Sequence, residues 1–290
     1  MKPPRFDYVA PRTLDEALAH LARHGDGAKI LAGGQSLIPL LNFRLAHPAV
    51  LVDINRVTDL AYVRAHGEGV GIGALTRLHA VERSEVVRAR APILTEACRH
   101  IGHLPIRHRG TIGGNLAHAD PASELPAVMI ALEAEFEVAG RAGARAVAAG
   151  AFFTGPLSTA LGPGEILTGI RIPGLPARTG TAFVEMARRA GDYALVGVAA
   201  VVTLDGAGRV ARARVALCGV GPTPVRATAA ESALVGQAPA GPALDDASAR
   251  AAAATSPPSD VHGSAEFRRK LARHFARQAI ATAAERAGGS

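Results

Sequence analysis

The stretch RGTIGGNLAHADPASELPAV, residues 109–128, joins a glycine pair to a polar segment that starts a helix. Gly113 and Gly114 follow a β-branched isoleucine and precede Asn115. Glycines at such a point let backbone amides approach an anion without obstruction from a Cβ atom. Glu124 follows ten residues after the pair, in the first turn of the predicted helix, where the helix dipole by itself favours an acid.

A second stretch, LAGGQSLIPLLNFRLAHPAVLVDI at residues 31–54, repeats this arrangement. Gly33 and Gly34 follow apolar residues and precede the amide side chain of Gln35. Neither stretch is a Walker A loop or a G-x-G-x-x-G fingerprint, so the usual nucleotide loops do not apply. Two anion-binding segments would suit a diphosphate. The alternative is that each pair is a turn that only glycine can form.

The composition is that of an ordinary globular protein with room for two domains. The chain has 290 residues, of which 48% are hydrophobic and 20% are charged. The formal net charge is +7, yet aromatic residues make up only 4% and no basic run is interleaved with them. We therefore expect no nucleic-acid binding. No apolar run approaches the roughly 20 residues of a membrane span, so no transmembrane segment is expected.

Cysteine usage excludes several kinds of site. Cys98 and Cys218 are far apart, and neither belongs to a C-x-x-C motif. This excludes a disulfide framework and a self-contained iron–sulfur or structural zinc site, and it predicts two buried, reduced thiols. The histidines are scattered without metal-ligand spacing, so no metal site is expected. The N-terminus lacks the apolar core of a secretory signal, which favours a cytoplasmic location.

The pattern along the chain predicts an α/β region followed by an α+β region. Thr13 and Glu16 form a capping box for a helix that ends at Gly25. A strand, the first glycine pair, a helix and the strand VLVDI follow, which makes a small α/β unit. Residues 85–101 are predicted to be helical and to bury an apolar face, with its core residues at Ile93, Leu94, Ala97 and Ile101.

After a linker near residues 174–180 the pattern changes. Three apolar runs, TAFVEMA, ALVGVAAVVTL and VARARVALCGVG, predict strands, and Asp205-Gly206 predicts a hairpin between two of them. Helices are expected over about 227–235 and 243–254, and a last one after Ser264. Strands followed by helices are typical of an α+β domain.

The two glycine stretches closely resemble the FAD-binding segments of the medium, flavoprotein subunit of the molybdenum hydroxylases. Xanthine dehydrogenase and aerobic carbon monoxide dehydrogenase belong to this family, and the resemblance is greatest to the carbon monoxide dehydrogenase type. It covers essentially the whole chain in the family's order, because it continues through FFTGPLSTAL, EILTGIRIP, RRAGDYALVGVAA and DVHGSAEFRRKLA.

The resemblance implies an α+β protein with two domains. Residues 1–176 would form a vanillyl-alcohol-oxidase-type (PCMH) FAD-binding domain, with α/β subdomains over about 1–57 and 58–176. Residues 177–290 would form an α+β domain like the C-terminal domain of the carbon monoxide dehydrogenase flavoprotein, with a three-stranded sheet and helices. The flavin would lie in a cleft between these parts.

The resemblance also implies a set of FAD-binding residues. The pyrophosphate would be held from one side by Ala32, Gly33, Gly34, Gln35 and Ser36, and from the other by Thr111, Gly113, Gly114 and Asn115. Glu124 would reach the ribityl or ribose hydroxyls; the alternative is an acid placed only for the helix dipole. Tyr193 would lie near the isoalloxazine ring; the alternative is an ordinary interface aromatic. No catalytic side chain and no metal ligand are expected.

The resemblance implies electron transfer as the function. Substrate would be oxidised on a large molybdopterin subunit, and electrons would pass through [2Fe-2S] clusters of a small subunit to FAD and on to a quinone or NAD. The expected assembly is a dimer of heterotrimers in the cytoplasm, peripheral to the inner membrane through the complex. Two alternatives stay open: a stand-alone flavin oxidoreductase of the same fold, and a non-redox module that binds an anion or nucleic acid.

Overall fold

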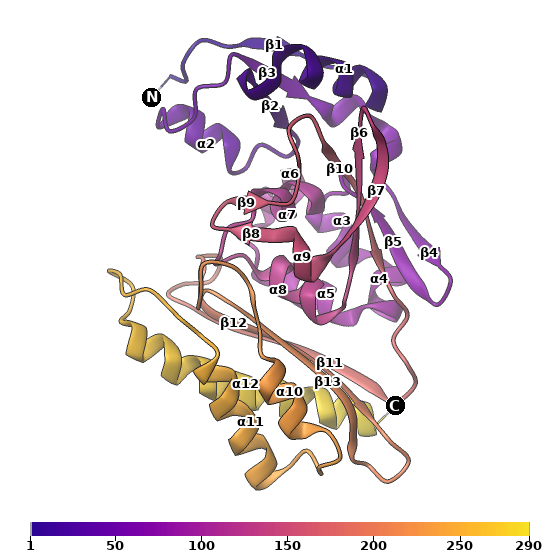
Figure 1. The fold of residues 1–290 in the computed structure, drawn as a ribbon, viewed down its shortest axis with the longest axis vertical. Coiled ribbons are helices and arrows are strands. Elements are labelled where there is room, and N and C mark those ends of the chain that lie inside the picture. The colour runs from indigo at the N-terminus through magenta and orange to yellow at the C-terminus, as the bar shows by residue number, and fades with distance from the viewer. Residues whose placement is uncertain (1, 290) are drawn as a thin grey trace.

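The computed structural model describes residues 2–289, which build three tiers along the longest axis of the molecule (Figure 1). The first tier holds a parallel three-stranded sheet of order β1-β3-β2. Its elements are β1 (Asp7–Val9), α1 (Leu14–His24), β2 (Ala28–Leu31), α2 (Leu37–Asn42) and β3 (Val50–Asp53). This tier is the small α/β unit that the sequence predicts.

Helix α1 shows why the first tier folds locally. The Thr13 side chain accepts a hydrogen bond from the backbone amide of Glu16, and Gly25 ends the helix with a φ of 52°. The Thr13 half of the predicted capping box and the stop at Gly25 are therefore confirmed, whereas the Glu16 side chain accepts from the backbone amide of Arg12 and not from that of Thr13. The buried face of α1, which includes Leu18 and Leu21, packs against the strands in one hydrophobic cluster.

The second tier is an antiparallel five-stranded sheet of order β4-β5-β10-β6-β7. Strand β10 (Ile166–Ile172) lies between β5 (Gly69–Gly73) and β6 (Glu135–Gly140), so segments far apart in the sequence are neighbours. The remaining elements of this tier are β4 (Val63–His66), α3 (Leu78–Arg83), α6 (Leu104–Arg109), α7 (Ile112–His118), α8 (Glu124–Ala131), β7 (Gly143–Ala148), α9 (Ala149–Phe152), β8 (Phe153–Gly155) and β9 (Ser158–Thr159).

The helical prediction over residues 85–101 is confirmed except at Ala91 and Ile101. The structure has two helices there, α4 (Glu85–Arg90) and α5 (Pro92–His100), separated at Ala91. Pro92 has no backbone N–H and disfavours helical geometry at the residue before it. Ala91 accordingly adopts φ −146° and ψ 60°. The predicted apolar face is nevertheless correct, because all four of its residues are buried.

The third tier confirms the predicted α+β pattern. Strands β11 (Thr179–Ala187), β12 (Ala194–Leu204) and β13 (Val210–Cys218) are antiparallel, and the turn between the last two begins at Asp205. A two-residue strand, β14 (Val225–Arg226), extends the predicted three strands to four. The helices are α10 (Thr228–Leu234), α11 (Gly241–Ala253) and α12 (Ala265–Gly288). Within residues 2–289, no helix is long and apolar enough to cross a membrane.

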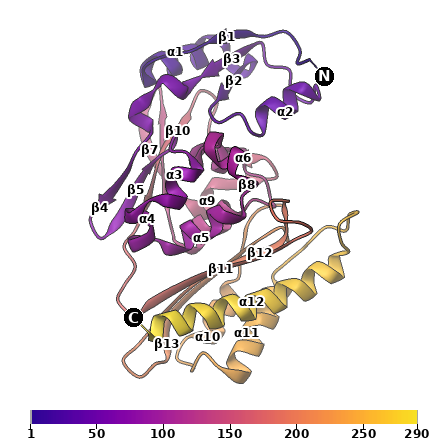
Figure 2. The ribbon, with the colours of Figure 1, turned by 180° about the vertical axis from the view of Figure 1, so that it is seen from behind.

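The third-tier sheet is covered on both faces. Because side chains alternate along a strand, Val196, Val198 and Val202 of β12 pack with α10–α12, whereas Ala199 and Val201 belong to the cluster of the second tier. Figure 2 shows the sheet between α12 on one side and α5 on the other. We call the contact of β11–β13 with α5 and α8 the seam. The second and third tiers therefore share one hydrophobic core across it.

Candidate functional site

The two glycine stretches are brought into direct contact. The first glycine segment, residues 32–36, connects β2 to α2, and the second, residues 109–115, runs from α6 into α7. Gly33 is buried, and a Cβ atom at this residue would lie 2.5 Å from the carbonyl oxygen of Arg109 and 2.7 Å from the Cα of Gly110. Only glycine allows backbones to approach this closely. The contact joins the first and second tiers at the site.

The first glycine segment presents a row of free backbone donors. The amides of residues 33–36 hydrogen-bond to no acceptor within the described part of the chain, and the same holds for the Ser36 hydroxyl. Gly34 has a φ of 74°, which is the left-handed conformation that favours glycine. The Gln35 side chain folds back and donates to the carbonyl oxygen of Gly33 at 3.2 Å. Successive free amides of this kind form an anion-binding concavity.

The second glycine segment differs from the prediction. Gly113 and Gly114 lie inside the first turn of α7, and their amides already have acceptors. Gly113 donates to the carbonyl oxygen of Ala74 at 2.9 Å, and Gly114 donates to the Thr111 hydroxyl at 3.1 Å. The amide of Asn115 donates to the Thr111 carbonyl. The idea that this glycine pair offers its amides to an anion is therefore wrong, because the helix cap and a neighbouring strand end use them.

The glycines of the second segment instead allow close packing. A Cβ atom on Gly113 would lie 2.5 Å from the Cβ of Ala74, and one on Gly114 would lie 2.7 Å from the Thr111 hydroxyl. Helix α7 can thus start directly against the end of β5. The Asn115 side chain accepts a hydrogen bond from Ser123 at 2.9 Å, which ties α7 to the residue that precedes Glu124.

Two residues that the sequence analysis missed join the glycine segments. The Asn55 side chain donates to the carbonyl oxygen of Ala32 at 2.8 Å and accepts from Arg77 at 2.7 Å. Arg77 also donates to the carbonyl oxygen of Arg109 in the second segment. Asn55 directly follows the predicted strand VLVDI, and a polar residue at a strand end could have been recognised as a candidate. Nothing in the sequence around Arg77 indicates that it joins the two glycine segments.

Glu124 is the first residue of α8, as predicted, but it is only 5% exposed. Its carboxylate has no hydrogen bond to another residue within 2–289 and no salt bridge there. Burial, and then the negative charge of Asp120, raise the pKa of Glu124 to about 7. A buried carboxylate whose only protein donor within residues 2–289 is its own backbone amide keeps acceptor sites for the hydroxyl groups of a ligand.

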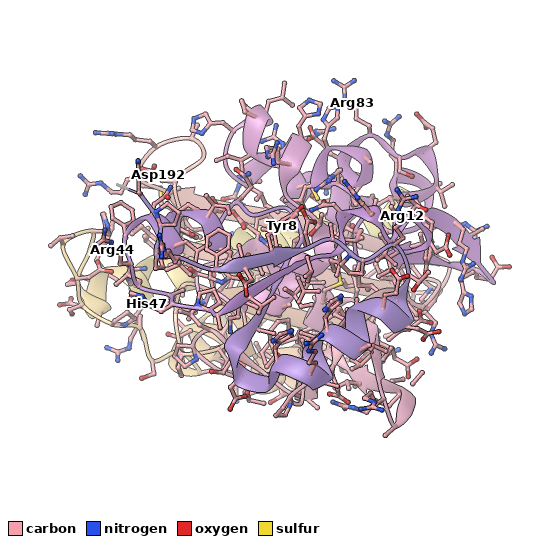
Figure 3. All side chains as sticks on the ribbon, turned by 90° about the horizontal axis from the view of Figure 1, so that it is seen from above. Tyr8, Arg12, Arg44, His47, Arg83 and Asp192 are labelled. Atoms are coloured by element: carbon pink, nitrogen blue, oxygen red, sulfur yellow. The ribbon has the colours of Figure 1, made fainter. Side chains whose placement is uncertain are left out.

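Tyr193 lies in the turn between β11 and β12 and is 63% exposed. Partial burial, Asp120 and Glu124 raise the pKa of its hydroxyl, so the side chain lies near these two acids. The same turn rests on the second tier, since a Cβ atom on Gly191 would lie 2.6 Å from the His103 ring. Seen from above, Asp192 lies on the same side of the molecule as Arg44 and His47, which follow α2 (Figure 3).

Comparison with known proteins identifies the family. Residues 4–175 match the FAD binding domain in molybdopterin dehydrogenase, and residues 181–283 match the carbon monoxide dehydrogenase flavoprotein C-terminal domain. The chain belongs to this FAD-binding family. The resemblance inferred from the glycine stretches is thereby confirmed, together with FAD as the cofactor and an oxidoreductase flavoprotein as the class of protein.

Three relatives show how close the match is. The carbon monoxide dehydrogenase medium chain of Afipia carboxidovorans is 44% identical, with 99% of each chain covered. The 6-hydroxypseudooxynicotine dehydrogenase complex subunit alpha of Paenarthrobacter nicotinovorans is 43% identical and covers 99% of this chain and 97% of its own. The structure of reconstituted carbon monoxide dehydrogenase from Oligotropha carboxidovorans superimposes with a TM-score of 0.96, at 44% identity, covering 99% of this chain and 100% of that chain.

The residues of this structure fit FAD. The free amides of the first glycine segment are donors of the kind that a diphosphate requires. Glu124 adds a buried acceptor near the second segment. Within residues 2–289, these amides have no other acceptor, and no other residue donates to the Glu124 carboxylate. Family membership also favours the medium-subunit reading over the stand-alone flavin oxidoreductase and the non-redox module.

Replacing Arg77 with alanine is expected to weaken FAD binding about 10-fold, or about 1.4 kcal/mol. The change removes the side chain that joins Asn55 to the backbone of the second segment, so the two glycine segments lose their shared support. Titration of flavin fluorescence measures the dissociation constant. Arg88→Ala is the control, because Arg88 pairs only with Glu85 on the exposed face of α4. Equal affinities for the two variants would contradict the bridging role.

Proposed function

We propose that the chain is the FAD-carrying medium subunit of a molybdenum hydroxylase complex, of the carbon monoxide dehydrogenase type. It would take electrons from [2Fe-2S] clusters of a small subunit and pass them to an external acceptor, a quinone or NAD. The observation that carries the proposal is the row of free amides over residues 33–36, held against the second glycine segment in a chain of this family.

The proposed binding site uses residues from all three tiers. The amides and the Ser36 hydroxyl of the first glycine segment hold the pyrophosphate, and the second segment forms the opposite wall. Glu124 accepts from sugar hydroxyls, and Tyr193 covers the isoalloxazine ring from the third tier. The complete proposed set is Ala32, Gly33, Gly34, Gln35, Ser36, Thr111, Gly113, Gly114, Asn115, Glu124 and Tyr193.

The proposed function requires no catalytic side chain on this chain. FAD, when bound, links the one-electron chemistry of iron–sulfur clusters to two-electron acceptors. The chain itself holds the flavin, excludes water through the buried backbone contact at Gly33, and sets the local charge through Glu124. No side chain has to activate a substrate, so we assign no catalytic residue.

The proposed partners are a large molybdopterin subunit and a small [2Fe-2S] subunit, assembled as a dimer of heterotrimers. Cys98 and Cys218 are both buried and free, and no group of three metal-ligating side chains occurs among residues 2–289. These observations are consistent with the proposal that the [2Fe-2S] clusters are bound by a partner subunit. We also propose the division into residues 1–176 and 177–290, and a cytoplasmic complex peripheral to the inner membrane.

The relatives' names leave the substrate open. Chains with 44% and 43% identity to this one belong to dehydrogenases named for carbon monoxide and for 6-hydroxypseudooxynicotine. Similar medium subunits thus serve complexes with unlike substrates. This supports the proposal that the substrate is recognised on the large subunit and not on this chain.

The purified chain is expected to be yellow, to contain one FAD, and to oxidise none of the substrates of the complex by itself. The physical reason is that the flavin site is complete in this chain whereas the molybdenum centre is not. Absorbance after acid release measures the FAD content, and a reduction assay with carbon monoxide or aromatic substrates measures activity. A colourless chain that FAD does not reconstitute would overturn the proposal.

Turnover by the isolated chain would instead support the stand-alone oxidoreductase. Co-purification provides the second half of the test. When a tagged chain is expressed in its native organism and affinity-purified, a cysteine-rich small chain and a molybdenum-containing large chain are expected to co-purify with it. Recovery of a homogeneous, active, single-chain flavoprotein would contradict the assembly.

A further inference from the structure

A second buried carboxyl group lies at the seam. Glu185 of β11 points to the same face as Phe183, toward α5. Its side chain is 3% exposed, and its Oε2 atom is buried without a hydrogen-bond partner among the described residues. The Oε1 atom lies 3.8 Å from Nδ1 of His100, which is beyond hydrogen-bond distance. A buried carboxyl oxygen left unpaired is costly, so such groups mark candidate functional sites.

No positive charge compensates this carboxyl group. No lysine or arginine within residues 2–289 forms a salt bridge with Glu185 or Glu124. Burial lowers the pKa of His100 against the opposing charge of Glu96, and its ring makes no hydrogen bond to Glu185 at 3.8 Å. Arg286 of α12 reaches the seam but binds Glu96 and the carbonyl oxygen of Thr181.

Glu185, Gly197 and Cys218 lie in register across β11, β12 and β13, and α8, which begins at Glu124, packs against β12 and β13 on the second-tier side of the seam. Burial, followed by the charge of Glu124, raises the pKa of Glu185 to about 8. The seam is anchored here by a hydrogen bond of 2.8 Å from the amide of Gly219, at the end of β13, to the carbonyl oxygen of Pro121. The two carboxyls are therefore coupled across the interface of the second and third tiers.

The other titratable groups at the seam do not relieve this coupling. Cys218 of β13 has its pKa raised by burial and by both carboxyls, and Cys98 of α5 has its pKa raised mainly by burial. The remaining groups that face the pair are Glu96 and His100 of α5, Asp120 before α8, and Tyr193 before β12. Two arginines also approach the seam: Arg286 binds Glu96, and Arg107 binds Glu82 beside Cys98. Within residues 2–289, neither arginine forms a salt bridge with Glu185 or Glu124.

We propose that Glu185 and Glu124 form a coupled proton site of the flavin pocket, which holds a proton at neutral pH and gains one when bound flavin becomes more negative. The proposal rests on the proposed function, because Glu124 is the member that lines the flavin site. In this step, one carboxylate of the pair takes up a proton from solvent and becomes a carboxylic acid. The electrons come from the partner's clusters, and none moves within the pair.

Infrared spectroscopy of the purified full chain tests the proton site directly. The wild-type protein is expected to show the carbonyl band of a protonated carboxylic acid at neutral pH, and Glu185→Gln is expected to remove it or halve it. Glutamine has the shape of the neutral acid, so the variant is expected to fold. Glu266→Gln is the control, because Glu266 is 77% exposed and pairs with Lys270. An unchanged band in Glu185→Gln would overturn the proton site.

Stability against pH gives a readout that needs no flavin signal. A carboxyl whose pKa is raised from 4.5 in the unfolded chain to about 8 in the folded chain binds more protons when folded. The wild type therefore loses stability as pH rises through this window, and Glu185→Gln is expected to lose less. Parallel curves of melting temperature against pH for the two proteins would contradict a protonated Glu185.

The flavin potential tests the coupling. Across the range of the two pKa values, about 7 and about 8, the midpoint potential of wild-type flavin is expected to fall more steeply with pH than that of Glu185→Gln. Spectroelectrochemical titration measures both. Identical slopes in two proteins that hold one FAD each would overturn the coupling. A wild-type chain without FAD would overturn the proposed function instead, and the infrared result would still decide whether the proton site exists.

Discussion

Replacing Gly33 with valine is expected to lower the affinity for FAD at least about 100-fold, which corresponds to about 2.7 kcal/mol. A Cβ atom at this position would lie 2.5 Å from the carbonyl oxygen of Arg109 and 3.0 Å from the backbone nitrogen of Thr111. These neighbours are backbone atoms, so no side chain can rotate away. The two glycine segments must separate, and the row of free amides then no longer faces the second segment.

Flavin fluorescence titration measures this loss, and circular dichroism reports whether the fold persists. Overpacking by itself costs about 1–3 kcal/mol of stability, so a control for the substitution is needed. Gly150→Val provides it, because no heavy atom lies within 4 Å of a Cβ atom there. A folded Gly33→Val protein with wild-type affinity would show that the contact of the two segments is not part of the site.

Replacing Glu133 with glutamine is expected to destabilise the chain by about 2–3 kcal/mol, somewhat below the cost of breaking a fully buried ion pair. Glu133 follows α8 and accepts from Arg212 at 2.6 Å, Arg214 at 2.9 Å and Arg226 at 3.3 Å. Arg214 is only 4% exposed, and its Nε atom has no partner within residues 2–289. The variant leaves this guanidinium buried without its acid.

The same cluster predicts a dependence on pH. Burial opposes ionisation of Glu133, but Arg214, Arg212 and Arg226 together lower its pKa below 4.5. A depressed carboxyl pKa contributes stability above the unfolded value, and this contribution is lost as pH falls below about 4.5. Urea unfolding at neutral and acidic pH is expected to show a difference between wild type and Glu133→Gln that shrinks on acidification.

Asp246→Asn is the control for this prediction. Asp246 pairs with Arg250 four residues along α11, and both side chains are 52% exposed. Such surface pairs contribute about 0.3–0.5 kcal/mol. If Glu133→Gln were no more destabilising than Asp246→Asn, the arginine cluster would not hold α8 to the third tier.

Local patterns predicted the secondary structure where the deciding interactions span a few residues. The cap at Thr13, the stop at Gly25 and the turn at Asp205 depend on neighbouring backbone groups, and all three are present. The helical prediction over residues 85–101 did not include the break at Ala91, because the apolar period continues through Pro92. The spacing of apolar residues predicts which face of a helix is buried. The position of the break depends instead on Pro92, which has no backbone N–H to donate.

The sequence predicted which two segments form the FAD site, but it did not predict how their backbone amides are used. Both glycine pairs have the same local pattern, yet the amides of residues 33–36 are free and those of Gly113 and Gly114 are bonded. The difference comes from partners at Ala74 and Thr111, and Ala74 is distant in the sequence. Arg77 was missed for the same reason, since its acceptors lie on Asn55 and Arg109.

The amino-acid sequence was sufficient to predict the fold class, the family and the cofactor. Glycine stretches, helix caps and apolar periods are local patterns that can be recognised without the three-dimensional structure. Only the tertiary structure decided which amides stay unpaired, how Gly33 locks two segments together, and that the second and third tiers share a core. It also buried Glu185 and Glu124 at the seam, where neither forms a salt bridge with a lysine or arginine of residues 2–289. Each of these features depends on residues that are far apart in the sequence. Their contacts are set by tertiary packing and not by the local sequence.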